Sequence, residues 1–189
     1  MSNNDIQQQT TVNIQEKANL IWAIADKLVG VYKPHEYGNV ILPMCVIKRF
    51  EDTLYPTKKK VLKKNEELDK DGIVVKKGFL ESAAEQKFYN LSPFDFQKLL
   101  NDPENIKVNF ESYLNHFSDN VIDIIHRMDF DREIEKMADN GVLYLVIKEF
   151  CTPKAYLGAD QITSVDMGYI FEELVRKFSE SYDEQAGAH

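Results

Sequence analysis

The chain has 189 residues, of which 43% are hydrophobic and 29% are charged, and its formal net charge is −8 at pH 7. This length suggests one domain or two small ones, and this composition is that of an ordinary soluble globular protein. No apolar run reaches the roughly 18 residues of a membrane span, and the polar N-terminus excludes a secretory signal. The acidic balance argues against a protein that binds nucleic acid over its whole surface, but it allows a local basic patch.

Two apolar-striped helices are predicted between residues 13 and 55, and we expect residues 1–12 to form a flexible leader. Asn13, with Glu16 three positions later, indicates an N-terminal capping box for the first helix. Each helix carries apolar residues at helical spacing on one face. We therefore expect this hairpin to be the scaffold against which the later helices pack.

The second helix of the hairpin, residues 40–55, contains a proline at position 43. Proline inside a helix removes a backbone hydrogen bond and costs roughly 3 kcal/mol. Either the helix starts near Ile41, so that Pro43 lies in its first turn, or the proline kinks the helix.

A new, highly charged segment, residues 57–68, follows the hairpin, with lysines ahead of acidic residues. Asp71 and Gly72 then indicate a turn. The β-branched run Ile73-Val74-Val75 is too short and too isolated for the core of a sheet. We expect at most one strand of a small β ribbon near residues 72–78.

From Phe79 onwards the apolar spacing predicts one helix after another, with Ser92 and Ser164 as expected N-caps. The predicted helices cover residues 79–88, 92–100, 102–117, 121–128, 131–138, 142–151 and 164–178. The helix at 121–128 is apolar on more than one face, so we expect it to be largely buried. The whole pattern predicts an all-α fold, a compact bundle of about eight or nine helices over residues 13–180, followed by a tail at 181–189.

The chain shows no spacing typical of a catalytic, cofactor-binding or metal site. Its four histidines form no H-x-x-x-H pair, and neither cysteine has a CxxC partner. The run from Asp129 to Glu133 resembles the start of a calcium loop, but Ile134 occupies the position where that loop needs glycine, so helix capping is the better interpretation. Cys45 and Cys151 lie on apolar segments and are predicted to be reduced and buried, as in a reducing cytoplasm.

The lysine-rich stretch is the charged feature that points to a function. Between residues 48 and 77 there are ten basic and six acidic residues, although the chain as a whole is acidic. This is either a solvated helical face or a surface that contacts nucleic-acid phosphates without reading sequence. The DNA-contact candidates are Lys58, Lys59, Lys60, Lys63 and Lys64, with Lys48 and Arg49 as weaker candidates. No helix starts with the basic and amide residues of a helix-turn-helix reader.

Several segments, in the same order, resemble the N-terminal helical domain of the modification subunits of type I restriction–modification systems. They are residues 20–28, 38–52, 88–96, 113–125 and 166–181, followed by Ala186-Gly-Ala-His189. The resemblance covers nearly the whole chain from about Asn13. In that family the tail leads into a catalytic domain, on which the last helix, residues 165–178, would pack.

The resemblance implies methylation of adenine N6 in double-stranded DNA with S-adenosylmethionine, in a complex of two modification subunits and one specificity subunit, which a restriction subunit joins for cleavage. The catalytic domain of the family carries a glycine-containing cofactor motif and an Asn-Pro-Pro-Tyr/Phe motif for the flipped base. This chain contains neither motif, so no catalytic residue or cofactor ligand is carried over. We expect a cytoplasmic, non-catalytic domain that assists subunit assembly and DNA clamping. The alternative is a stand-alone helical interaction protein that regulates assembly with the specificity subunit.

Overall fold

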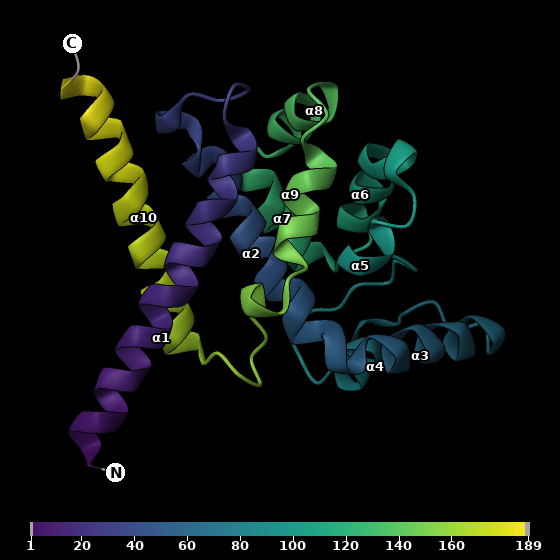
Figure 1. Ribbon diagram of the computed structural model, residues 1–189. Coiled ribbons are helices and arrows are strands. Elements are labelled where there is room, and N and C mark those ends of the chain that lie inside the picture. Colours follow the sequence, from purple (N-terminus) through teal and green to yellow (C-terminus); the bar gives the residue numbers. More distant parts are fainter. Residues whose placement is uncertain (1, 188–189) are drawn as a thin grey trace.

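The computed structural model describes residues 2–187, without the side chains of 5–12, 182 and 184–187 (Figure 1). Within this range the chain forms α-helices and short 3-10 helices and contains no strand, so the all-α prediction is confirmed. The α-helices are α1 (Asn3–Ala23), α2 (Gly38–Leu54), α3 (Lys58–Lys70), α4 (Lys77–Ala84), α5 (Phe96–Leu99), α6 (Ile106–Asn115), α7 (Asp119–Arg127), α8 (Asp131–Asp139), α9 (Leu143–Phe150) and α10 (Ser164–Gly187). The 3-10 helices are Ile24–Leu28, Pro34–Glu36, Tyr55–Thr57, Pro103–Asn105 and Pro153–Ala155.

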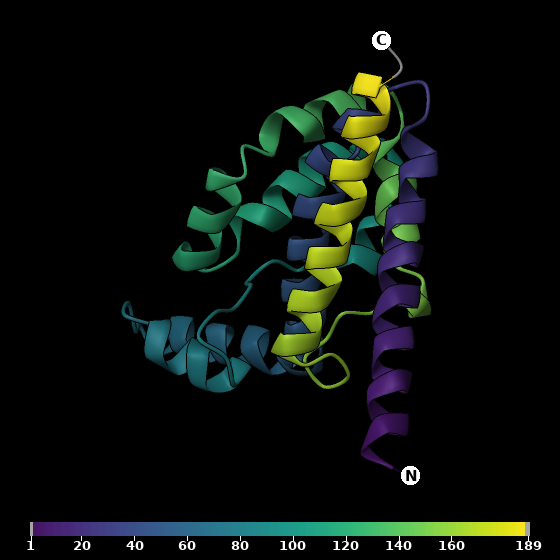
Figure 2. The same ribbon diagram turned by 90° about the vertical axis from the view of Figure 1, so that its left-hand side faces the viewer.

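The longest helices, α1 and α10, lie side by side along one side of the molecule (Figures 1 and 2). Ala18 and Ile21 of α1 and Ile170 and Leu174 of α10 are fully buried. Helix α1 begins ten residues before the expected capping box, so the predicted start at Asn13 is wrong. The polar stretch before it contains neither glycine nor proline, and nothing in it interrupts a helix.

Helix α2 runs through the centre of the molecule, and its apolar face is completely buried at Val40, Ile41, Met44, Cys45 and Ile47. It begins at Gly38, so Pro43 lies beyond the first turn, and of the two alternatives the start near Ile41 is wrong. Helix α10 packs close to this start, because a Cβ placed on Gly38 would overlap the ring of Phe178. The position therefore needs glycine for a close approach between two helices.

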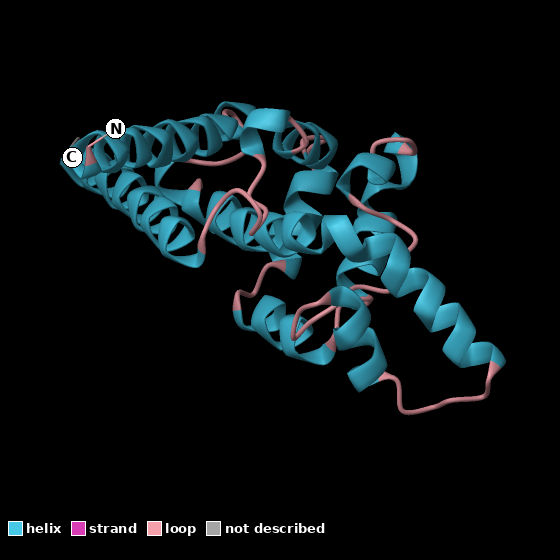
Figure 3. Ribbon diagram, turned by 90° about the horizontal axis from the view of Figure 1, so that it is seen from below, coloured by secondary structure: helices cyan, strands magenta, loops and turns pink. Residues whose placement is uncertain are grey.

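Helices α3 and α4 form a pair that projects from the body (Figures 1 and 3). The loop between them, residues 73–76, has no regular secondary structure, so the predicted ribbon near residues 72–78 is wrong. The reason is that no second segment of the described chain pairs with it. The only β-type pairs in the described residues are two isolated bridges, Val29 with Tyr32 and Asn90 with Phe117.

Two expected caps and one expected burial pattern differ from the structure. The N-cap of α5 is Asp95, whose carboxylate accepts from the Lys98 backbone N–H at 2.7 Å, whereas Ser92 closes a turn before it. At the start of α10 the hydroxyl of Thr163, not Ser164, accepts the N–H of Asp166. Helix α7 buries Val121 and Ile125 but exposes Ile124, so it is amphipathic and not largely buried.

Both cysteines are free thiols; Cys45 is fully buried and Cys151 is half-buried. Within residues 2–187 no helix is long and apolar enough to span a bilayer. The predicted tail at 181–189 continues α10 as far as Gly187, and its last two residues lie outside the described range.

Candidate nucleic-acid interface

The first half of α3 carries the lysines that the sequence singled out. Lysine and leucine are good helix formers, and Val61 and Leu68 give the helix a buried stripe. Its opposite side is open to solvent at Lys59, Lys60 and Lys63. None of these three side chains has a hydrogen-bond or ion-pair partner among the described residues. Together they form the basic face of α3.

The order of charges along α3 is the reverse of the order that stabilises a helix. The N-terminal end of a helix is electropositive, so cations there are unfavourable and anions are favourable. Here the lysines occupy the first turns, and Glu66, Glu67 and Asp69 come later. The helix dipole therefore adds to the positive potential of the basic face. The position of these lysines does not stabilise the helix, so helix stability does not explain it.

Lys58 lies beside the basic face but points inward. Its ammonium donates to Oδ1 of Asn90 at 2.9 Å and to the carbonyl oxygen of Phe94 at 3.2 Å, and it lies 5.6 Å from the centroid of the Tyr113 ring. Burial lowers the pKa of Lys58 to about 8, against the opposing charge of Glu51. This cation fastens α3 to the segment before α5 and is not free to bind phosphate.

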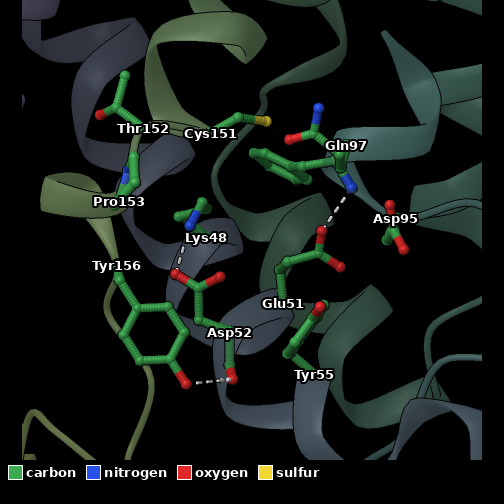
Figure 4. Close-up of a pocket in the computed structure, with 11 residues that line it drawn as sticks. Lys48, Glu51, Asp52, Tyr55, Asp95, Gln97, Cys151, Thr152, Pro153 and Tyr156 are labelled. Carbon is green, nitrogen blue, oxygen red and sulfur yellow. Dashed lines mark hydrogen bonds and ion pairs between the residues drawn. The ribbon is translucent and has the colours of Figure 1, made fainter. Parts of the chain in front are cut away.

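Glu51 of α2 is the buried acidic side chain of the same region (Figure 4). One carboxylate oxygen accepts the backbone N–H of Phe96 at 2.5 Å, and the other accepts the hydroxyl of Tyr113 at 3.0 Å. Burial raises the pKa of Glu51 to about 7, although these hydrogen bonds and Lys58 oppose the shift. The carboxylate thus joins α2 to the start of α5 and to α6.

Lys48 pairs with Asp52 one turn later on α2, and both side chains are almost completely buried. The carboxylate of Asp52 also accepts the Leu157 N–H at 2.8 Å. Arg49 donates to the carbonyl oxygens of Leu157 and Ile162, at 2.8 and 2.6 Å. Lys48 and Arg49 are therefore engaged with protein groups around the loop between α9 and α10, although Arg49 is only half-buried.

Lys64 is intermediate between these two groups. Its ammonium lies 3.9 Å from a carboxylate oxygen of Glu67 and 5.6 Å from the ring centroid of Phe79. Both contacts are at the surface, where an ion pair contributes about 0–1 kcal/mol. Lys64 can thus exchange its partner for a phosphate at little cost.

Sequence reasoning missed the buried acids Glu51 and Asp52, which a closer use of the helical period would have found. On α2, Lys48, Glu51 and Asp52 come seven residues after Ile41, Met44 and Cys45, which are fully buried. Seven residues are about two helical turns, so the polar and apolar residues share one face. This spacing predicts that the acids are buried, whereas their charge suggested that they are exposed.

A pocket of about 200 Å³ opens between α2, the start of α5 and the end of α9 (Figure 4). Charged groups line it at Lys48, Glu51, Asp52 and Asp95, and the sulfur of Cys151 lies at its wall. Burial raises the pKa of Cys151 to about 12, so this thiol is not a nucleophile at neutral pH. Among the described residues no three His, Cys, Asp or Glu side chains cluster as a metal site. We assign no chemistry to this pocket.

Comparison with known proteins identifies the family. The sequence profile described as the HsdM N-terminal domain matches residues 17–150, well over half of the chain. Searches of curated protein sequences and of solved structures found no match. The chain belongs to the HsdM N-terminal domain family, the N-terminal domain of the methyltransferase subunit of type I restriction–modification systems.

Proposed function

We propose that this domain assists subunit assembly and clamps double-stranded DNA in a cytoplasmic type I complex that methylates adenine N6. The observation that carries the DNA part is the basic face of α3, where Lys59, Lys60 and Lys63 are exposed and unpaired in the described part of the chain. Lysines neutralise phosphates and release counterions from DNA. Such contacts hold DNA in position but read no sequence.

The cations that are bonded to protein groups have a supporting role in this proposal. Lys58 fixes the start of α3 to the body, and Lys48 and Arg49 fix the loop after α9. They stabilise the scaffold that presents the basic face. Lys64, at the edge of that face, is the fourth side chain that we propose to contact DNA.

The cofactor of the family's reaction, S-adenosylmethionine, has no place in this part of the proposal. The pocket beside α2 has about 200 Å³, below the roughly 300–1,000 Å³ of a site for a drug-sized ligand. Charged side chains already paired with protein groups line it, including Lys48 and Asp52. These residues do not fit the cofactor, and we propose no methyl-transfer step at this pocket.

The DNA proposal is tested by the salt dependence of binding to duplex DNA of unrelated sequences. Changing Lys59, Lys60 and Lys63 to Gln together should lower the slope of log affinity against log salt by roughly 0.9 for each phosphate that is no longer neutralised, up to about 2.7. The matched control changes Lys27, Lys98 and Lys148, which lie outside α3, and removes the same net charge. An unchanged slope, or an equal decrease in the control, would remove DNA contact from the basic face.

The assembly part rests on α10. This helix exposes Val165, Tyr169 and Val175 at 66%, 53% and 39% although its other face is buried. Val165 and Tyr169, one turn apart, share a helix face, and exposed apolar side chains on one face favour a protein contact. We expect Tyr169→Glu to weaken co-purification with the modification and specificity subunits, whereas Val108→Glu on α6 should not. If the unaltered chain binds neither subunit, the assembly proposal is wrong.

A further inference from the structure

Helix α10 contains a glycine for which the packing of the described chain gives no reason. Gly38 and Gly78 are the first and second residues of their helices, whereas Gly168 is the fifth residue of α10 and lies beyond its first turn. A glycine inside a helix costs about 0.5–1 kcal/mol relative to alanine. A Cβ placed on Gly168 would meet nothing within 4 Å. The described chain therefore loses stability at this position and gains no packing from it.

Gly38 shows what a glycine on a helix face does in this protein. A Cβ placed on Gly38 would overlap the ring of Phe178, so the missing side chain lets α2 and α10 approach each other closely. Gly168 offers the same bare stretch of helix backbone, but it is exposed, and no described residue fills the space. The position is suited to a helix from outside the described chain.

Exposed side chains surround Gly168 on the outer face of α10. Val165 lies three residues before it, and Glu172 and Val175 lie four and seven residues after it, so these residues form one stripe along the helix. Val165 and Val175 are 66% and 39% exposed, and Tyr169, next to the glycine, is 53% exposed. In Figure 2 α10 lies at the front of the molecule, and no other helix crosses in front of it. Apolar side chains on both sides of a bare backbone position form a groove of the kind into which a second helix packs.

The charges of α10 indicate which kind of helix fits. The helix contains six acidic and two basic residues. Arg176 pairs with Glu173 and Glu180, whereas Glu172, in the stripe itself, has no ion pair among the described residues. A second copy of α10 would bring one acidic face against another, which is unfavourable. A helix with lysine or arginine at the edge of its apolar face is complementary to Glu172.

We propose that the outer face of α10 is the docking site for a basic helix of a partner subunit, which places a bulky apolar side chain against the backbone at Gly168. Val165, Tyr169 and Val175 flank that side chain, and Glu172 pairs with a cation of the partner. Helices commonly bind to protein surfaces through apolar anchors one and two turns apart. This contact rests on the assembly part of the function proposed above, and it specifies the chemistry of the partner and the residue that admits it.

The test measures the affinity of the full chain for two probes, the purified modification subunit and the purified specificity subunit. Gly168→Ala and Gly168→Leu place a side chain where the partner helix lies, and this overpacking should weaken binding roughly 5- to 100-fold, more for leucine than for alanine. Gly78→Ala on α4 is the matched control, because a Cβ there also meets nothing within 4 Å. Urea unfolding of the free chain should show that Gly168→Ala is at least as stable as the native chain, so that lost binding is not lost folding.

A charge reversal tests the chemistry of the partner. Glu172→Lys should weaken the same binding roughly two- to tenfold, whereas Glu104→Lys, at an exposed and unpaired acid outside α10, should not. Gly168 variants that bind as tightly as the native chain, or a Glu172→Lys variant that binds no more weakly, would overturn the proposal and leave the assembly role intact. A dimer of the native chain alone that Gly168→Leu dissociates in sedimentation velocity would place a second copy on α10 and overturn it as well. A native chain that binds neither probe contradicts the assembly role itself.

Discussion

The buried carboxylate of Glu51 makes the sharpest prediction about the scaffold. Glu51→Leu removes the acceptor for the Phe96 N–H and the Tyr113 hydroxyl, which lie 2.5 and 3.0 Å from it. Each buried donor left without a partner costs about 1–3 kcal/mol, so the variant should lose about 2–6 kcal/mol of unfolding free energy. Glu51→Gln keeps an oxygen for Phe96 and an amide that can donate to the Tyr113 oxygen, so near pH 5 it should cost about 1 kcal/mol or less.

The sign of the pH dependence follows from the direction of the shift. Burial raises the pKa of Glu51 from 4.5 to about 7 in the folded protein. Between these values the unfolded chain has released the proton and the folded chain still holds it. Stability from this group is therefore present below pH 4.5 and is lost as the pH rises to 7, by at most about 1.4 kcal/mol per pH unit. Glutamine cannot ionise, so the stability of Glu51→Gln relative to the native chain should rise over this window.

The assay is urea unfolding followed by circular dichroism at several pH values from 4.5 to 7, with the variant always compared with the native chain. Other titrating groups then cancel, and equal m-values confirm that the same surface unfolds. Glu66→Gln removes a carboxylate from the surface of α3 and is the matched control. A Glu51→Gln difference that is flat with pH, or a Glu51→Leu cost no larger than that of Glu51→Gln, would refute this account of the buried carboxylate.

Three further outcomes follow from the packing, each measured by urea or thermal unfolding. Gly38→Ala should destabilise the protein by about 1–3 kcal/mol because the new methyl meets Phe178. Gly168→Ala meets nothing within 4 Å and should stabilise it by about 0.5–1 kcal/mol. Similar changes in stability for the two variants would contradict the close approach of α10 to Gly38. Arg49→Ala removes two charge-assisted hydrogen bonds and should cost about 2–3 kcal/mol and speed amide exchange in the loop after α9. Leu174→Ala, at a fully buried position, should cost about 2–5 kcal/mol.

The sequence was sufficient to predict the helices because their signals are local. Apolar residues recur at helical spacing, and proline and glycine mark the ends, so α8 and α9 lie within one residue of the ranges expected for them. The exact starts depend on distant residues. Ser92 and Asp95 are both good capping residues, but Glu51, 45 residues away, holds the N–H of Phe96, so α5 starts after Asp95. Local chemistry cannot choose between the two.

The sequence was enough to locate the basic surface but not to decide which cations belong to it, because charge alone does not reveal which way a side chain points. Lys58 and Lys59 are neighbours separated by about 100° around the helix, and one is half-buried and bonded to Asn90 while the other is exposed. The difference is measurable. Seven contacting cations would give a salt slope near 6, whereas the four that the structure leaves available give at most about 3.6. A steeper slope would mean either that Lys48, Arg49 or Lys58 also reaches DNA or that another surface contributes.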